Sequence, residues 1–278
     1  MNIEFGKIMS EALMHPDSYN FHSHTQFCDG RSPMEEMVVS AIKSGMRWFG
    51  FSPHSPINVA TPCNMTKEDV APYLEEVYRL KGIYGEKISL YAGMEVDYIS
   101  ADWGPHTDYF QNLPLDFIIG SIHFIPTRTG EYIDVDGRPE SFAIKLKKKF
   151  DNDLRYVVET FFRQTYEMIE RGGLDILGHF DKIKRNAEFV SPGIGSESWF
   201  ISLSDNIARK AIERGVAVEI NTKAYADTGF FFPDPLHWKA LQNAGILLLI
   251  NSDAHFADKI QASRREAYEM LNAITSRQ

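Results

Sequence analysis

The feature that most restricts the fold of this chain is a set of potential metal ligands, each placed just after a short apolar run. Six histidines and three acidic residues share this placement: His22, His24, Asp29, His54, Glu95, His123, His179, Asp253 and His255. Because the strand ends of a parallel barrel converge on one rim, polar residues at those ends can meet although they are far apart in sequence. The pattern therefore predicts one pocket rich in nitrogen and oxygen ligands, which we interpret as a multinuclear metal centre.

Apolar runs and helical patterns alternate along the chain. Seven β-rich or apolar runs cover residues 19–24, 48–52, 88–96, 117–124, 174–177, 216–220 and 246–250. Helical periodicity is found over residues 33–45, 67–84, 153–171, 198–214 and 235–244. Ser32 is expected to cap the first of these helices. The alternation predicts an α/β protein with a parallel barrel, incomplete or distorted, and no linker divides residues 1–278 into smaller domains.

The composition is that of an ordinary globular enzyme, with 44% hydrophobic and 24% charged residues. A formal net charge of −9 argues against a general nucleic-acid binder, which would be expected to be basic. The two cysteines provide no disulfide framework. No run of 18 apolar residues and no signal-peptide pattern is found, so we expect a cytoplasmic protein with no membrane partner.

The longest stretch without a clear helical or strand pattern covers residues 126–151. It is polar and contains a run of lysines, and we expect it to be irregular. Connections of this length are often lids or binding loops, but a solvated surface excursion is an equally good interpretation. Both alternatives stay open at the level of the sequence.

Two pairs of residues have the i, i+2 spacing that places both side chains on one face of a strand. His22 and His24 follow the first apolar run, and Asp253 and His255 follow the last one. Since the first and last strands of a closed barrel are neighbours, the two pairs would lie side by side and could bind metal. Because the spacing occurs twice, a chance arrangement of core histidines is the weaker interpretation.

The other candidates each have a structural alternative. Asp29 precedes a glycine, and Asp-Gly is a common turn dipeptide. Glu95 ends a buried run, where a carboxylate is costly unless a metal or another cation meets it. Asp97 shares the strand face of Glu95, and we expect it to support a ligand rather than to be one. His123 and His179 each end an apolar run, and either one alone could be a hydrogen-bonded core histidine.

The remaining histidines and the cysteine nearest to the candidate ligands carry weaker signals. His15 precedes a proline, His106 lies in a loop rich in glycine and proline, and His237 falls inside a predicted helix. We expect these three to be structural or solvated. Cys28 lies close to the candidate ligands, but no Cys-x-x-Cys or Cys-His spacing supports a thiolate ligand.

Seven segments in this order resemble the polymerase-and-histidinol-phosphatase (PHP) family of metal-dependent phosphoesterases. The segments are HSHTQFCDG, FSPHSP, GMEVDYI, DFIIGSIH, DILGHFDKIKR, VEINTKAY and INSDAH. Together they span nearly the whole chain, and their spacing is most similar to that of monofunctional histidinol-phosphate phosphatases. The resemblance implies a distorted (β/α)7 TIM-like barrel, which agrees with the seven runs.

The resemblance also implies three metal sites, which share ligands. The first would use His22, His24, Glu95 and Asp253; the second Glu95, His123 and His179; the third Asp29, His54 and His255. Many members of the family have histidine where this chain has Asp29, so the third site departs from the usual pattern. Imidazole and carboxylate donors without thiolates suit three divalent transition-metal ions such as Zn, Fe or Mn.

The activity implied is hydrolysis of L-histidinol phosphate, a small phosphate ester, by a metal-bound hydroxide. Glu95, Asp253 and His255 would be the catalytic residues because they hold the ions around the reacting water. The alternatives are a phosphodiesterase, a phosphatase acting on nucleotides or another small ester, and a metal-stabilised binding module without turnover. No general acid for the leaving group is identified.

Substrate-binding residues are harder to assign. Arg185 is favoured over Lys182 and Lys184 for phosphate because a guanidinium can bind two oxygens at once, and Arg264 is favoured for the same reason. Solvated charge on a helix is the alternative for each arginine. Asn221 is expected to contact the amine or imidazole of the substrate.

Overall fold

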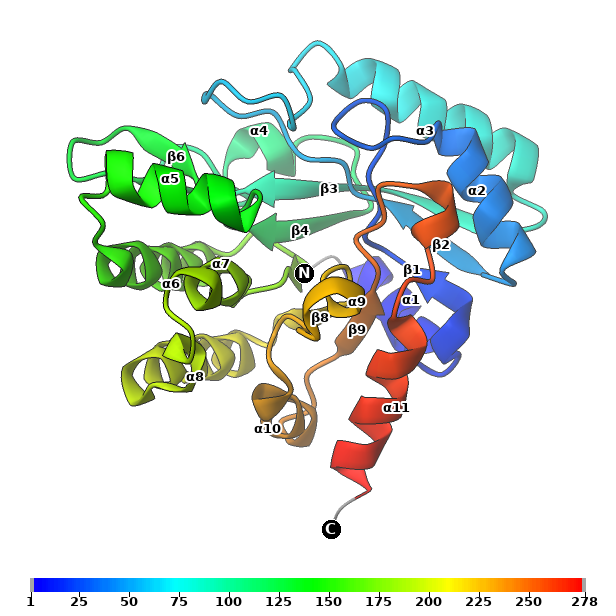
Figure 1. Cartoon of the computed structure of the whole chain (residues 1–278). Helices are drawn as coiled ribbons and strands as arrows, with labels where there is room; N and C mark the ends of the chain where they lie inside the picture. Colours follow the sequence, from blue (N-terminus) through cyan, green and yellow to red (C-terminus); the bar gives the residue numbers. More distant parts are fainter. Residues whose placement is uncertain (1–2, 277–278) are drawn as a thin grey trace.

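The computed structural model describes residues 3–276, and within them seven parallel strands form one nearly closed barrel (Figure 1). In spatial order these are β1 (Tyr19–Asn20), β2 (Trp48–Phe51), β3 (Ser89–Asp97), β4 (Phe117–Ser121), β7 (Ile176–Leu177), β8 (Ala217–Asn221) and β9 (Leu248–Asn251). Every neighbouring pair is parallel. The prediction of a seven-stranded (β/α) barrel is confirmed.

The first and last strands meet just beyond their regular portions. Ser23 and Ala254 form an isolated parallel bridge, and the His24 N–H donates to the Ala254 carbonyl at 2.9 Å. The Ala254 N–H in turn donates to the His22 carbonyl at 3.3 Å. These contacts bring the two i, i+2 pairs side by side, as the sequence predicts.

Helices surround the strands and close one end of the barrel (Figure 1). They are α1 (Ile3–Leu13), α2 (Met34–Lys43), α3 (Val70–Tyr84), α4 (Asp108–Gln111), α5 (Pro139–Lys149), α6 (Leu154–Arg171), α7 (Ile183–Val190), α8 (Ser198–Arg214), α9 (Tyr225–Thr228), α10 (Trp238–Asn243) and α11 (Arg264–Thr275). The five predicted helical patterns correspond to α2, α3, α6, α8 and the region of α10. None of the described helices combines the length and the apolar character needed to cross a bilayer.

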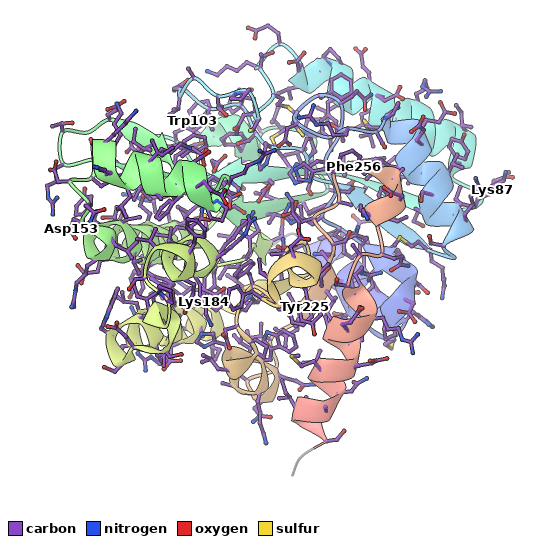
Figure 2. The ribbon with its side chains drawn as sticks, in the orientation of Figure 1. Lys87, Trp103, Asp153, Lys184, Tyr225 and Phe256 are labelled. Carbon is purple, nitrogen blue, oxygen red and sulfur yellow. The ribbon has the colours of Figure 1, made fainter. Side chains whose placement is uncertain are left out.

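The barrel interior is apolar at its amino end. Phe5 of α1 stacks on Phe117 with ring centroids 4.5 Å apart, and both belong to a buried cluster with Tyr19, Phe21 and Leu249. A Cβ at position 93 would lie 2.2 Å from the Phe117 ring, so only glycine leaves room for this ring on β3. Side chains fill the space between the strands (Figure 2), so the barrel is a packed core and not a pore.

The interior becomes polar toward the carboxyl ends of the strands. Because side chains alternate along a strand, Glu219 and Asn221 of β8 point to the same side as Ala217, which belongs to the buried apolar cluster. Both polar residues are 0% exposed. The polar layer therefore lies above the apolar one, inside the same barrel.

Two local expectations are wrong. Ser32 does not cap α2, because its Oγ accepts the Ala257 N–H at 3.1 Å and Pro33 occupies the N-cap position. The segment 126–151 is not irregular: β5 (Phe124–Pro126) pairs with β6 (Tyr132–Asp134) as a hairpin, and α5 follows. Tertiary contacts outweigh local propensity in both cases. The pattern over residues 235–244 is helical as predicted, with a 3₁₀ turn that continues directly into α10.

Candidate metal centre

All nine predicted ligand residues meet at the carboxyl end of the barrel. They come from loops or strand ends after β1, β2, β4, β7 and β9 and from β3 itself, and each one lies within 4.0 Å of another member of the set. We call this set the ligand cluster. Residues separated by most of the chain are neighbours here because parallel strands deliver their ends to one rim.

Glu95 lies at the middle of the ligand cluster and is 1% exposed. Its Oε1 is 2.8 Å from His179 Nε2 and 3.5 Å from His123 Nε2. Its Oε2 is 3.0 Å from His54 Nδ1 and 3.3 Å from His22 Nε2. Oε2 is also 3.7 Å from His24 Nε2. One carboxylate thus faces five imidazoles, an arrangement suited to a ligand that is shared between two ions.

A second carboxylate faces the first pair of histidines. Asp253 Oδ1 is 2.9 Å from His24 Nε2 and 3.9 Å from His22 Nε2. Asp253 has a φ of 49°, in the left-handed region that side chains other than glycine rarely adopt. Strained residues of this kind are concentrated at functional sites, where the surrounding structure holds them in place.

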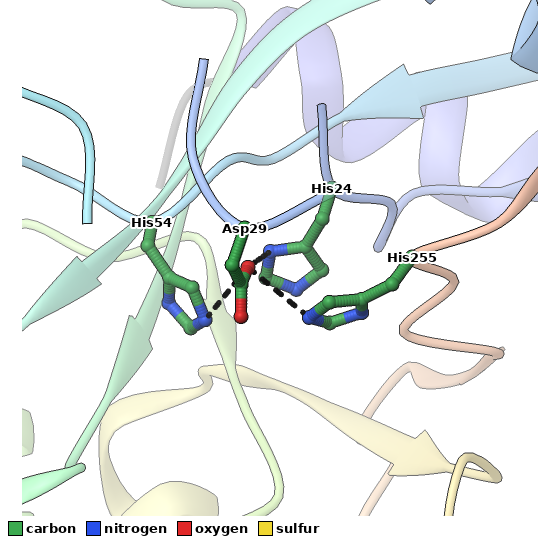
Figure 3. A group of neighbouring side chains, drawn as sticks. All are labelled: His24, Asp29, His54 and His255. Carbon is green, nitrogen blue, oxygen red and sulfur yellow. Dashed lines mark ion pairs between the residues drawn. The ribbon is translucent and has the colours of Figure 1, made fainter. Parts of the chain in front are cut away.

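Asp29 is the centre of a third group, shown in Figure 3. Its Oδ1 lies 3.2 Å from His255 Nε2, 3.6 Å from His24 Nδ1 and 3.9 Å from His54 Nε2. His24 therefore contacts both Asp253 and Asp29 through its two ring nitrogens, whereas the resemblance places it in the first site alone. The turn interpretation of Asp29 does not explain this convergence.

The donor atoms of the cluster fit a bound cation. Six of them are buried and make no aligned hydrogen bond to any described residue: His22 Nε2, His24 Nε2, Asp29 Oδ1, His54 Nδ1, Glu95 Oε2 and His123 Nε2. Buried polar atoms without partners are costly, and a divalent cation coordinated by them would remove that cost. Four groups of three or four side chains bring their donor atoms within 4.8 Å of one another. The donors are nitrogen and oxygen only, as transition-metal ions with imidazole and carboxylate ligands require.

Two carboxylates outside the ligand cluster orient its imidazoles. Glu219 Oε1 is 2.7 Å from His22 Nδ1, and Asp97 Oδ1 is 2.8 Å from His123 Nδ1. Each contact leaves the Nε2 of that histidine facing Glu95, as carboxylates behind metal-bound histidines commonly do. Asp97 has the supporting position that the sequence predicts. Glu219 was missed, although an acidic residue in the apolar β8 run was a usable signal.

The charges of the buried groups are strongly coupled. Burial alone would lower the pKa of His22, but the carboxylates of Glu219, Glu95 and Asp253 raise it well above its ordinary value. Burial likewise opposes ionisation of Glu95, but the imidazoles of His22, His54 and His123 hold its pKa well below the usual range. The carboxylates therefore stay ionised and attract either protons or metal ions to the surrounding imidazoles.

His123 and His24 respond in opposite directions. For His123, Asp97 and Glu95 overcome the effect of burial and raise the pKa to about 9. For His24, burial and the neighbouring His255 lower the pKa well below its ordinary value. Without metal, His123 carries a proton near neutral pH and His24 does not, which matches the neutral state that metal ligation requires for His24.

Two lysines approach the ligand cluster, although arginines were the residues predicted to bind phosphate. Lys182 is 8% exposed, and its Nζ lies 3.0 Å from Asp136 Oδ2 and 3.8 Å from Asp253 Oδ2. Lys223 Nζ is 3.1 Å from Asp253 Oδ1 and 3.3 Å from His255 Nε2. These ammonium groups bring positive charge to the edge of the ligand cluster.

The prediction that Arg264 binds phosphate is wrong. Its side chain is 1% exposed, and its guanidinium donates to the carbonyls of Ile250 at 3.0 Å and Pro16 at 3.1 Å. It also lies over the rings of Tyr19 and Tyr268. Arg264 therefore joins α11 to the barrel wall, and its donors are used in the fold.

Asn221 also has another role than the predicted substrate contact. Its fully buried amide donates to Glu219 Oε2 and Asp253 Oδ2, both at 3.1 Å, and so holds two carboxylates in place. Arg185 on α7 is partly buried, and its Nε lacks a hydrogen-bond partner among the described residues. Its contact with phosphate stays a prediction.

The residues set aside in the sequence analysis lie apart from the ligand cluster or cannot join it as ligands. His15 stacks on Trp48, His106 Nε2 contacts the Ala101 carbonyl, and His237 Nε2 contacts Ser204 Oγ. Cys28 Sγ is 3.6 Å from His24 Nδ1, but burial raises the pKa of its thiol to about 11. The Cys28 thiol also donates to the Thr25 carbonyl at 3.3 Å.

Comparison with known proteins agrees with this geometry. The family model of the PHP domain matches residues 20–223, which include seven of the nine clustered residues. The chain belongs to the PHP domain family. Among curated PHP-domain relatives, the histidinol-phosphatase of Bacillus subtilis is 27% identical over 260 residues, which cover 86% of this chain and 94% of the relative.

Solved structures show the same fold as this PHP-domain chain. HisK from Listeria monocytogenes has a TM-score of 0.75 at 19% identity, with 87% of this chain and 97% of that chain covered. Histidinol phosphate phosphatase from Lactococcus lactis, solved with zinc, L-histidinol and phosphate, has a TM-score of 0.67 at 18% identity, with 92% and 93% covered. The barrel fold is therefore shared with both.

Proposed function

We propose that this PHP-domain protein is a metal-dependent phosphomonoesterase that hydrolyses L-histidinol phosphate to L-histidinol and phosphate. The observation that carries the proposal is the convergence of nine imidazole and carboxylate side chains, with six buried donor atoms that no described residue satisfies. Curated relatives from Bacillus subtilis and Lactococcus lactis, which match 86% and 91% of the chain, are named histidinol-phosphatases. The zinc, L-histidinol and phosphate in the Lactococcus lactis structure are consistent with this chemistry.

Three overlapping groups of side chains would hold the ions, which we expect to be Zn, Fe or Mn. The groups are His22, Glu95 and His179; His22, His24 and Asp253; and His24, Asp29, His54 and His255. His123 with His54 and Asp97 forms a fourth grouping that shares His54 with the third. Shared ligands couple the sites, so the loss of one central residue should disturb more than one ion.

When bound, such ions polarise a phosphoryl oxygen and lower the pKa of a water molecule. Three divalent ions would contribute +6 and the carboxylates of Asp29, Glu95 and Asp253 −3, which leaves a net +3 for a phosphate dianion. The ammonium groups of Lys182 and Lys223 add positive charge at the same place. The residues of this chain therefore attract and orient the phosphate end of the substrate.

A substrate panel tests the proposal. Purified protein of measured metal content is offered L-histidinol phosphate, an aryl phosphate, a bis-aryl phosphodiester and single-stranded DNA, and the kcat/KM values are compared. We expect L-histidinol phosphate to have the highest value and the chelated protein to be inactive. Preference for the diester or DNA would identify a phosphodiesterase instead, and silence on every substrate with metal present would identify a binding module.

A further inference from the structure

The loop between β6 and α5 brings a carboxylate to the edge of the ligand cluster. Asp136 and Gly137 of this loop line the same pocket as His54, His123 and His255. After β4 the chain leaves the barrel and forms the β5–β6 hairpin. The loop that follows β6 then lies beside the carboxyl end of the barrel, next to the ligand cluster. A residue of this loop can therefore meet a part of the substrate that the ligand cluster does not hold.

Several hydrogen bonds hold this loop in one conformation. The Val135 N–H donates to the His123 carbonyl at 2.8 Å. The Asn186 amide on α7 donates to the carbonyls of Val135 at 2.8 Å and Asp136 at 2.6 Å. Asp134 Oδ1 accepts the Asp136 N–H at 2.8 Å. A carboxylate held this firmly loses little freedom when it binds a ligand, which favours recognition.

The two carboxylates of the loop differ in their partners. Asp134 Oδ2 is paired with Lys145 Nζ of α5 at 2.7 Å, and its Oδ1 accepts backbone N–H groups. Asp136 Oδ2 is paired with Lys182 Nζ, which also faces Asp253. The Asp136 side chain is 31% exposed, so a ligand in the pocket can reach it. Both carboxylates are therefore paired with a lysine, but the lysine beside Asp136 also faces Asp253 of the ligand cluster, whereas the lysine beside Asp134 lies on α5.

Three other carboxylates near the ligand cluster that we do not assign to metal do not line this pocket. Asp97 contacts His123 and the Asn64 amide. Glu219 is fully buried and contacts His22 and the amides behind it. Asp181 is 1% exposed and accepts the Asp234 N–H. Three carboxylates are found among the described residues that line this pocket: Asp29 belongs to the ligand cluster, Asp134 is paired with Lys145, and Asp136 lies beside Lys182, where it can accept a second cationic group.

We propose that Asp136 is a specificity-determining residue that accepts the ammonium group of a phosphate monoester of a 2-amino alcohol. The inference rests on the proposed function and names the feature of the substrate that the pocket selects. Two carbons separate the ammonium from the ester oxygen in such a compound. By ordinary bond lengths, the ammonium nitrogen therefore lies within about 5 Å of the phosphorus atom. The Lys182 ammonium spans a similar gap, 3.0 Å from Asp136 and 3.8 Å from Asp253.

Matched substrates that differ only in the amine test this inference. The kcat/KM values for O-phosphoethanolamine and ethyl phosphate are measured with wild-type protein and Asp136→Asn, and L-histidinol phosphate is compared with its analogue lacking the amine. Because the leaving groups differ in intrinsic reactivity, the change of each ratio between the two proteins is the measure. We expect Asp136→Asn to reduce the preference for the amine by about 10- to 100-fold, as for loss of a close charge pair.

Asp134→Asn is the matched control because it alters the same loop but removes a carboxylate that Lys145 neutralises. We expect its amine preference to stay at the wild-type value even if both rates fall. Elemental analysis gives the metal content of each variant, and loss of metal would lower the rates of both members of a pair equally. An unchanged ratio in Asp136→Asn would overturn the inference and leave Asp136 as a partner of Lys182 alone.

The two proposals fail in different ways. If wild-type protein ignores L-histidinol phosphate but prefers O-phosphoethanolamine through Asp136, the proposed function is wrong and this inference stands. If wild-type protein hydrolyses L-histidinol phosphate and Asp136→Asn keeps the amine preference, the proposed function stands and the inference about Asp136 is wrong. Absence of turnover on every ester, with metal confirmed, overturns both.

Discussion

Asp175 precedes β7 at the amino end of the barrel, whereas Glu95 lies near the opposite end of β3, and the two buried carboxylates have different partners. Asp175 Oδ2 accepts the backbone N–H of Ile118 at 2.9 Å. Asp116, which precedes β4, likewise accepts the Ala92 N–H at 2.7 Å. At the carboxyl end, Glu95 faces imidazoles instead of backbone donors.

This difference indicates that the carboxylates at the amino end stabilise the fold, whereas Glu95 at the carboxyl end is available for metal binding. A carboxylate that accepts a backbone N–H joins neighbouring strands, and Asp116 is also paired with Lys81 Nζ at 2.9 Å, as expected of polar residues that stabilise the amino end of a barrel. Glu95 Oε2, in contrast, is buried without an aligned hydrogen bond from any residue between positions 3 and 276. The same functional group is thus part of the fold at one end and a metal-ligand candidate at the other.

Replacement of the central carboxylate, Glu95, should have the largest effect on metal binding and activity. Glu95→Gln removes the charge that faces five imidazoles, so we expect loss of bound metal and a fall in kcat/KM of about 10²-fold or more. Elemental analysis and steady-state kinetics on L-histidinol phosphate provide the measurements. Full metal stoichiometry in this variant would count against a shared ligand at this position.

A smaller effect on the metal is expected from the carboxylate behind His22. Glu219→Gln keeps the size of the side chain but loses the charge that lies 2.7 Å from His22 Nδ1. Metal affinity, measured by competition with a chelator, should fall about 10- to 100-fold. The melting temperature of the metal-free variant serves as a control for folding, and an affinity equal to that of wild type would contradict the orienting role.

Protons should compete with metal only at the carboxyl end. Since the pKa of His123 in the metal-free fold is raised from 6.5 to about 9, its proton stabilises that fold below about pH 6.5, and this contribution is lost as the pH rises through 9. Metal must displace the proton, so we expect affinity to fall up to about tenfold per unit as the pH drops below 9. Chelator competition from pH 7 to 9 and calorimetric proton release measure this. A flat profile without proton release would refute it.

The amino-end carboxylate should affect stability and leave the metal unchanged. Asp175→Ala removes the acceptor of the Ile118 N–H, and we expect a loss of about 1–3 kcal/mol in the free energy of unfolding. Metal content and kcat/KM should stay within about twofold of wild type because the residue lies at the other end of the strands. Denaturant unfolding and elemental analysis check both parts. Loss of metal here would mean that the two ends are coupled.

The parts of the site that could be predicted depend on local geometry. His22 with His24 and Asp253 with His255 were recognisable because alternate residues of a strand share a face, which holds wherever the strand lies. Asp97 was placed correctly behind the ligands for the same reason. Short apolar runs between helical patterns were sufficient to predict seven strands.

The parts that could not be predicted depend on distant contacts. Arg264 and Lys182 both follow a histidine of the cluster in sequence, yet the arginine is used within the barrel wall and the lysine faces the cluster. The role of Asp136 depends on a hairpin and α7, which local periodicity did not reveal. No property of these residues taken alone distinguishes the two outcomes.

The order of apolar runs and polar ends determined the barrel and the kind of donor atoms at its rim. The three-dimensional structure decided which donors share a carboxylate, which lysine approaches them and which loop crosses the pocket. The physical reason is that side-chain alternation belongs to each strand separately, whereas distances between strand ends depend on the tilt and stagger of the closed barrel. His24 illustrates both: its face was predictable, but its contact with Asp29 as well as Asp253 required the barrel to close.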